Sequence, residues 1–129
     1  MEKGEAETVR GLLAKFAAVH DQKRPAIEEL TKGAREDWKE GKITDEELME
    51  AYDRAELELG YGEADKRAEV NLVRFGLFLM ETVAKGEEER RAINYLYNGA
   101  EHWLVRDRVI PVLISWFDAS LADEKREGK

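Results

Sequence analysis

His102 stands among side chains that could hold a flat ligand. Gly99 lies three residues before it and Arg106 four residues after it, so a helix would bring all three to one face, beside the indole of Trp103. An imidazole can ligate haem iron, a glycine leaves clearance, and the guanidinium of Arg106 or Arg108 could bind propionates. The pattern predicts a pocket for a small apolar or aromatic ligand. Within this class of ligand, haem is the specific candidate cofactor, with His102 as its metal ligand. The chain carries no haem-attachment motif.

Glycines inside apparent helices indicate where such a pocket could lie. Gly76 falls in the most apolar part of the segment at 63–85, and Gly99 shares a helical face with His102 and Trp103. A glycine inside a helix costs about 1 kcal/mol relative to alanine, so it usually has a packing or functional reason. Two interpretations stay open, of which close helix–helix contact is the commoner and a pocket near Gly76, Gly99, His102 and Trp103 is the more specific. A lone histidine on a mixed face is also most often an ordinary hydrogen-bonded residue.

Asp118 and His102 are the candidate catalytic groups if the protein is an enzyme. Asp118 follows Ile114 on one helical face, so partial burial would raise the pKa of its carboxyl and suit it as a general base. The simpler interpretation places Asp118 at the solvent edge, or in an ion pair with an arginine, which is the usual fate of aspartate. His102 is the other candidate base.

The composition excludes several classes of partner and site. The chain has 129 residues and no cysteine, which removes disulfides and thiolate chemistry. Its formal charge of −8 disfavours nucleic acid and anionic membranes, because both bind basic patches. No apolar run reaches the length of about 18 residues that a membrane span needs, and the charged start lacks a signal-peptide pattern. These features predict a soluble, cytoplasmic protein.

The hydrophobic spacing predicts only helices. Apolar residues recur at helical intervals over 5–38, 45–59, 63–85 and 92–121, and no segment alternates as a strand would. Pro25 either kinks the first helix or opens a second one. Arg106 to Arg108 are expected to form a polar break, after which Pro111 lies in the first turn of a new helix or kinks one long helix. We therefore expect a single domain over 1–129, an all-α antiparallel bundle of four to six helices, kinked near Pro25 and Pro111, with a frayed tail at 123–129.

The segment EGKITDEELMEA at 40–51 carries the clearest local signal. Gly41 suits a helix C-terminus, and Thr44 with Glu47 forms a capping box that starts the next helix. The segment resembles the G-x-[IL]-T-x-E-E-[LF] turn of many small bacterial helical modules, including SHOCT domains. This resemblance covers about thirty residues, implies a helical hairpin, and carries no function with it.

A second class of function is self-association or a bare scaffold. The apolar helix at 109–121 would then bury itself against another copy, with Trp116 or Phe117 at a homodimer interface. The agreement between caps, charged outer faces and missing cysteines is also typical of a computationally designed bundle, and thermophile proteins share much of it. Four glycines inside apparent helices count against a designed origin.

Overall fold

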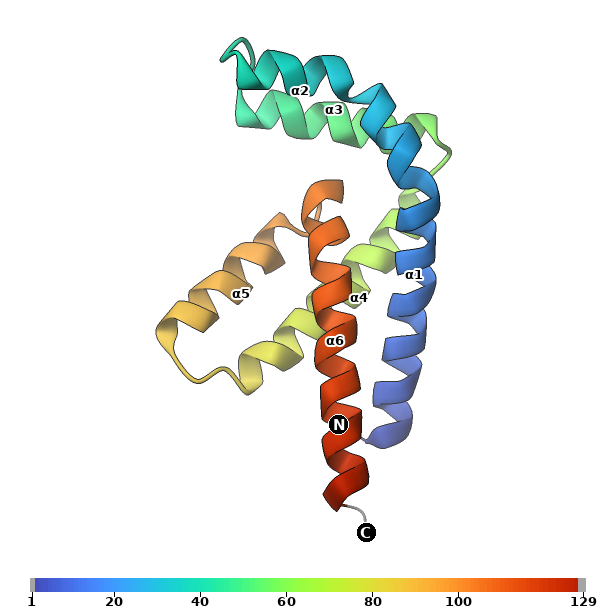
Figure 1. Cartoon of the computed structure of the whole chain (residues 1–129), viewed down its shortest axis with the longest axis vertical. Helices are drawn as coiled ribbons and strands as arrows, with labels where there is room; N and C mark the ends of the chain where they lie inside the picture. Colours follow the sequence, from blue (N-terminus) through green and yellow to red (C-terminus); the bar gives the residue numbers. More distant parts are fainter. Residues whose placement is uncertain (1, 128–129) are drawn as a thin grey trace.

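The two longest helices, α1 (Lys3–Leu30) and α6 (Trp103–Glu127), lie side by side and antiparallel in the computed structural model, which describes residues 2–127 (Figure 1). Helix α4 (Glu63–Thr82) packs against both of them, and α5 (Glu87–Gly99) packs against α4 and α6. Helices α2 (Lys32–Lys39) and α3 (Asp45–Glu58) form a hairpin across the upper end of this group. The prediction of an all-α bundle with four to six helices is confirmed.

Neither Pro25 nor Pro111 ends a helix in the structure. Helix α1 runs through Pro25 and ends at Leu30, where the buried Thr31 donates its hydroxyl to the carbonyl of Ile27 at 2.7 Å. Figure 1 shows the upper end of α1 leaning toward α2, as a proline inside a helix favours. Pro111 also lies inside a helix, α6, so of the two alternatives for this proline the first-turn position was wrong.

The break between the last two helices spans Ala100 to His102. The expected polar break at Arg106 to Arg108 was therefore wrong, because these residues belong to α6. At the other end, α6 extends to Glu127. The tail predicted to fray at 123–129 is thus helical as far as Glu127, and its last two residues lie outside the described chain.

The hairpin of α2 and α3 forms as its local sequence predicts. Gly41 has a φ of 74°, a left-handed conformation that glycine adopts without steric cost, and it turns the chain after α2. Thr44 Oγ1 then accepts a hydrogen bond from the Glu47 backbone N–H at 3.1 Å, and Glu47 Oε1 accepts one from the Thr44 N–H at 3.1 Å. This confirms the capping box.

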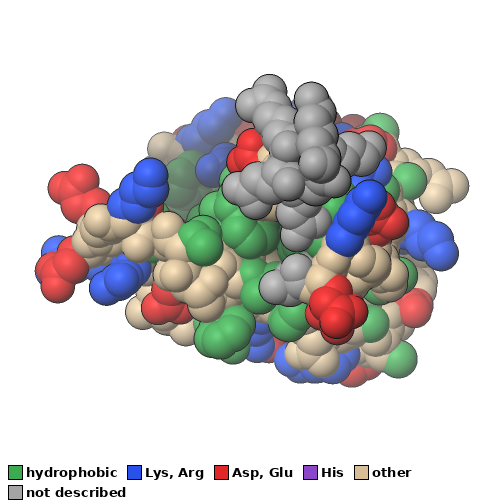
Figure 2. Space-filling model, turned by 90° about the horizontal axis from the view of Figure 1, so that it is seen from below, with side chains coloured by type: hydrophobic (Ala, Val, Ile, Leu, Met, Phe, Trp, Pro, Cys, Tyr) green, Lys and Arg blue, Asp and Glu red, His purple; other side chains and the backbone are tan. Residues whose placement is uncertain are grey.

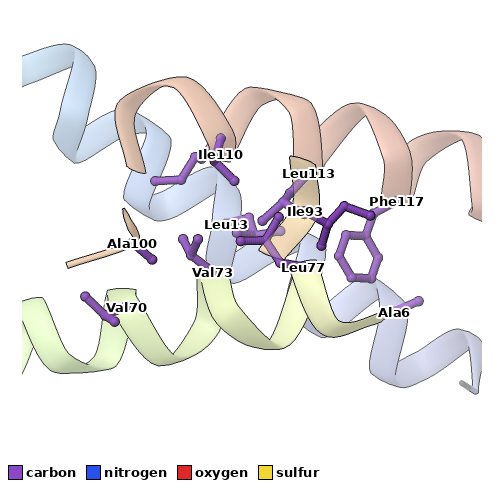
Figure 3. Close-up of a cluster of buried hydrophobic side chains, with 11 residues drawn as sticks. Ala6, Leu13, Val70, Val73, Leu77, Ile93, Ala100, Ile110, Leu113 and Phe117 are labelled. Carbon is purple, nitrogen blue, oxygen red and sulfur yellow. The ribbon is translucent and has the colours of Figure 1, made fainter. Parts of the chain in front are cut away.

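The buried apolar side chains form two clusters. The lower cluster joins α1, α4, α5 and α6, and it includes Leu13, Val73, Leu77, Leu113 and Phe117 (Figure 3). The upper cluster lies where α3 meets α1 and α6, and it consists of Ile27, Leu48, Tyr52, Ala55 and Trp103. The hairpin is therefore attached to the bundle by its own apolar contacts.

Helix α4 buries only one of its two apolar faces. Val70, Val73 and Leu77 are buried, whereas Phe75 and Phe78 on the other side are 44 % and 55 % exposed. Apolar side chains gather in the middle of the lower face of the molecule (Figure 2). No helix within residues 2–127 is both long and apolar enough to cross a membrane.

Helix α6 directs its apolar face into its own bundle. Val109, Ile110, Leu113 and Phe117 are each at most 2 % exposed, and Phe117 contacts Trp116 edge to face with a centroid separation of 5.0 Å. Trp116 and Phe117 were the two aromatic residues expected at a homodimer interface. Phe117 is buried within its own chain and has no surface to offer a partner. The homodimer itself stays a prediction.

Candidate functional site

A layer of charged and polar side chains separates the two apolar clusters. Its fully buried members are His20 on α1, Glu56 on α3, Glu69 on α4 and Arg106 on α6. On α1, His20 lies between Leu13 of the lower cluster and Ile27 of the upper one, and on α6, Arg106 lies between Ile110 and Trp103. We call these four residues, with Tyr61, Asp107 and Arg24, the polar layer.

Arg106 is the centre of the polar layer. Its Nε donates to Glu69 Oε1 at 2.7 Å, and its Nη2 donates to Glu56 Oε2 at 2.5 Å. Its Nη1 donates to the backbone carbonyls of Ala100 and Glu101, at 3.0 and 2.8 Å. These last two bonds hold the turn between α5 and α6. The guanidinium is therefore bonded within the protein on all three nitrogens.

His20 lies between two carboxylates. Its Nε2 is 2.5 Å from Glu69 Oε1, and its Nδ1 is 3.1 Å from Asp107 Oδ1. A protonated imidazole can donate to both carboxylates, whereas a neutral one can donate to only one of them. The ring stacks on Trp103 with a centroid separation of 3.7 Å and an interplanar angle of 7°. Arg24 also donates to Asp107, from Nη2 to Oδ1 at 2.7 Å and from Nε to Oδ2 at 3.1 Å.

The pKa values of the two buried glutamates of the polar layer are shifted in opposite directions. Burial alone would raise the pKa of Glu69, but the hydrogen bond and charge of His20, together with Arg106, outweigh burial and hold that pKa below its usual value. Burial raises the pKa of Glu56, and the charge of Arg106 opposes only part of this effect. Glu69 is therefore the stabilising carboxylate of the pair at neutral pH.

This difference gives a pH-dependent prediction. A lowered folded-state pKa means that Glu69 contributes stability above the unfolded pKa of about 4.3, and that this contribution is lost as the pH falls through the folded pKa. We expect Glu69→Gln to lower the free energy of unfolding by about 2 kcal/mol at pH 7 and by much less at pH 3. A raised pKa has the opposite sign, so Glu56→Gln should cost less at pH 7 than at pH 3. Urea unfolding of both variants across this range tests the pair, and parallel trends would contradict it.

A groove of about 790 Å³ lies between the α2–α3 hairpin and the α5–α6 turn. Gly99 and His102 line it, so the structure brings these two predicted residues into one cavity. The hairpin side contributes Trp38, Leu48 and Met49, among others. The sequence does not indicate these residues, because nothing local shows that the hairpin folds over the α5–α6 turn.

Trp38 lines the groove, and a hydrogen bond fixes the position of its ring. Its Nε1 donates to Asp45 Oδ1 at 2.7 Å, which links the end of α2 to the start of α3. Tyr95 on α5, across the groove, is 75 % exposed. An aromatic ring fixed by a hydrogen bond contributes contact area to a ligand with little loss of side-chain entropy. The groove thus has one ordered aromatic wall before any ligand binds.

The other predicted pocket residues lie elsewhere. A Cβ built at Gly76 would come within 3.0 Å of Leu113, so this glycine serves close packing of α4 against α6. Trp103 and Arg106 are buried in the upper cluster and the polar layer. The four residues predicted to form one pocket, Gly76, Gly99, His102 and Trp103, therefore do not lie around a single cavity. Only Gly99 and His102 line the groove.

Asp118 is an exposed ion-pair partner. Its carboxylate accepts hydrogen bonds from Arg10 at 2.9 and 3.3 Å, and 52 % of its side chain is exposed. The hydrogen bond from Arg10 lowers the pKa of Asp118, whereas the general-base interpretation expected a raised pKa. That expectation was wrong, and the solvent-edge interpretation is the one that holds. His102 as a base stays a prediction.

Two central residues of the polar layer, Glu56 and Glu69, were missed in the sequence. Glu69 stands on the inner stripe of α4 next to Val70, and Glu56 follows Ala55 on the inner stripe of α3. A glutamate on an otherwise apolar stripe is the signal that could have indicated both, since buried carboxylates need a cation as partner.

Comparisons of the chain with protein-family models, with curated proteins and with solved structures give no match.

Proposed function

We propose that the protein binds a small, partly apolar molecule in the groove between the α2–α3 hairpin and the α5–α6 turn. The observation that carries this proposal is the groove itself, whose volume of about 790 Å³ falls within the range of about 300 to 1,000 Å³ typical of ligand sites. Its lining combines apolar side chains such as Leu48 and Met49 with the ring of Trp38 and a few polar groups. This is the composition that small-molecule sites share.

Haem is the cofactor predicted from the sequence for such a site. His102 lines the groove, as an axial ligand would require. Arg106, expected to bind a propionate, is instead bonded to Glu56, Glu69 and two carbonyls. The proposal therefore extends to the wider class of flat or compact apolar ligands.

Filling the groove should weaken the binding of an apolar probe. Nile red is a neutral dye whose fluorescence rises in apolar surroundings, and we expect it to bind the wild-type protein. Met49→Trp places a larger ring in the groove and should weaken the dye at least about tenfold, which corresponds to about 1.4 kcal/mol. Fluorescence titration of the dye measures this change.

Leu57→Trp is the matched control for this titration. Leu57 is on the same helix, is 65 % exposed and does not line the groove, so this variant should bind the dye as the wild type does. Equal binding by all three proteins would place the dye elsewhere, on the apolar lower face for example. An absence of binding to the wild type would also contradict the proposal.

A further inference from the structure

Helix α4 carries a stripe of exposed residues with the spacing of a coiled-coil seam. Alternate steps of four and three positions connect its members, which are Ala64, Ala68, Asn71, Phe75, Phe78 and Thr82. All six are exposed, and the two phenylalanines are exposed by 44 % and 55 %. Helices α1, α5 and α6 pack against the other sides of α4. We call this stripe the α4 seam. It is a helix face with two large apolar side chains that the described part of its own chain leaves open.

The α4 seam is complementary in size to an antiparallel second copy of itself. Around a two-fold axis at position 73, Ala68 of one copy faces Phe78 of the other, and Asn71 faces Phe75. Each ring therefore meets a smaller side chain, whereas a parallel copy would place each phenylalanine against its own counterpart. A single asparagine in such a seam also favours one register of the two helices.

The charges along one edge of the α4 seam fit the same arrangement. Arg67 and Glu81 are exposed and lie seven positions on either side of Arg74, so an antiparallel copy brings Arg67 of each chain close to Glu81 of the other. A hydrogen bond of 2.9 Å to Glu101 holds the Arg67 side chain at this edge. Arg74 points toward α5 instead, because it donates to the Tyr97 carbonyl at 3.1 Å and lies over the Tyr97 ring. Opposite charges therefore meet twice at this edge.

We propose that the protein forms an antiparallel homodimer through the α4 seam. A second copy is the partner that this face fits, because both the sizes and the charges of its side chains are complementary to themselves about nearly the same point. An interface with an unrelated protein would need no such symmetry. At the other edge of the seam, the partly buried Leu72 lies one position from the axis and meets Leu72 of the second copy. The inference is separate from the proposed function, since no residue of α4 is among those that line the groove.

A charge placed in the α4 seam should dissociate the dimer. We expect the wild type to dimerise in sedimentation equilibrium at micromolar to millimolar concentrations. Phe78→Asp puts a carboxylate into the apolar contact and should raise the Kd of the dimer at least about tenfold. Val112→Asp is the matched control, because Val112 is exposed by 53 % but lies on α6, and it should dimerise as the wild type does.

Exchanging the charges at the edge of the α4 seam tests the pairing itself. Arg67→Glu brings two like charges together at both contacts, and so does Glu81→Arg, so each variant alone should dimerise at least about tenfold more weakly than the wild type. An equimolar mixture of the two variants should form a dimer again. In that mixed dimer, one contact pairs the two substituted side chains with opposite charges and the other contact is that of the wild type. This recovery would not occur if the substitutions acted by unfolding the chain.

Cross-linking gives the orientation of the two copies. The chain has no cysteine of its own, so Ala64→Cys and Thr82→Cys each introduce a single thiol at the seam. A short thiol-reactive cross-linker should join these two variants to each other and neither of them to itself. In the antiparallel dimer, the two copies of position 64 are about 27 Å apart, at 1.5 Å per helical residue.

Three results would overturn this inference. The first is a strict monomer in sedimentation of the wild type at millimolar concentration. The second is a dimer that persists in Phe78→Asp and is lost in Val112→Asp, which would assign the interface to α6. The third is self-cross-linking of Ala64→Cys, which would make the copies parallel. Binding of Nile red in the groove, and its loss in Met49→Trp, tests the proposed function independently of all three.

Discussion

Replacing Arg106 by methionine is expected to lower the free energy of unfolding by about 3 to 5 kcal/mol, the usual cost of removing one partner from a buried ion pair. The variant removes the guanidinium from the buried carboxylates of Glu56 and Glu69, of which Glu69 keeps only its contacts with His20 and Tyr61. It also leaves the carbonyls of Ala100 and Glu101 without their donor. Urea unfolding at pH 7, followed by circular dichroism, measures the loss. The loss should shrink in acid, because protonated carboxyl groups no longer need the cation.

Arg10→Met is the matched control for this variant. Arg10 also binds a carboxylate, that of Asp118, but the side chains are 39 % and 52 % exposed. Exposed ion pairs contribute about 0 to 1 kcal/mol, so this substitution should have little effect on stability. Glu69→Gln added to Arg106→Met should recover part of the loss, since it removes one of the two carboxylate charges that lost the guanidinium. Equal losses of unfolding free energy in the Arg10 and Arg106 variants would contradict the stabilising role of the polar layer.

Trp103→Ala is the second substitution with a large expected effect. Trp103 is 1 % exposed, belongs to the upper apolar cluster and stacks on His20. Its removal leaves a cavity beneath the hairpin and removes the ring that stacks on His20. Large-to-small changes at buried tryptophans cost about 3 to 5 kcal/mol of unfolding free energy. Thermal and urea unfolding of the purified variant measure the loss.

Trp38→Ala gives the comparison for Trp103. Trp38 is 43 % exposed at the groove, so its loss should cost less than about 1 kcal/mol of stability, as for other surface positions with a single contact. The same variant should weaken ligands of the groove. A stability loss at Trp38 equal to that at Trp103 would contradict the division between a structural and a ligand-facing tryptophan.

The helices could be predicted from the sequence because their signals are local. The capping box at Thr44 and Glu47, the glycine turn after α2 and the apolar stripe through Leu13 and Ile27 each depend on residues a few positions apart. The break before α6 was misplaced for the opposite reason. Arg106 looks like a loop residue until it is paired with Glu69 and Glu56, which lie 37 and 50 positions away. No local pattern contains that information.

The candidate site was predictable only in part. Gly99 and His102 share a groove because they lie only three positions apart at one turn, which the sequence shows directly. The opposite wall comes from the α2–α3 hairpin, and its placement depends on how Tyr52 and Trp103 pack in the upper cluster. Gly76 was assigned to the pocket because helical spacing does not tell which neighbour a glycine faces. In the structure that neighbour is Leu113.

The polar layer also bears on how the helices are aligned along their axes. Apolar stripes tolerate sliding, because a helix displaced by one turn of about 5.4 Å still presents apolar side chains to its neighbour. Arg106 does not tolerate it, since the same displacement would carry its guanidinium out of reach of both glutamates. His20, fixed between Glu69 and Asp107, restricts α1 in the same way. We infer that these buried charges select one register of α1, α4 and α6 among several that the apolar contacts alone would permit.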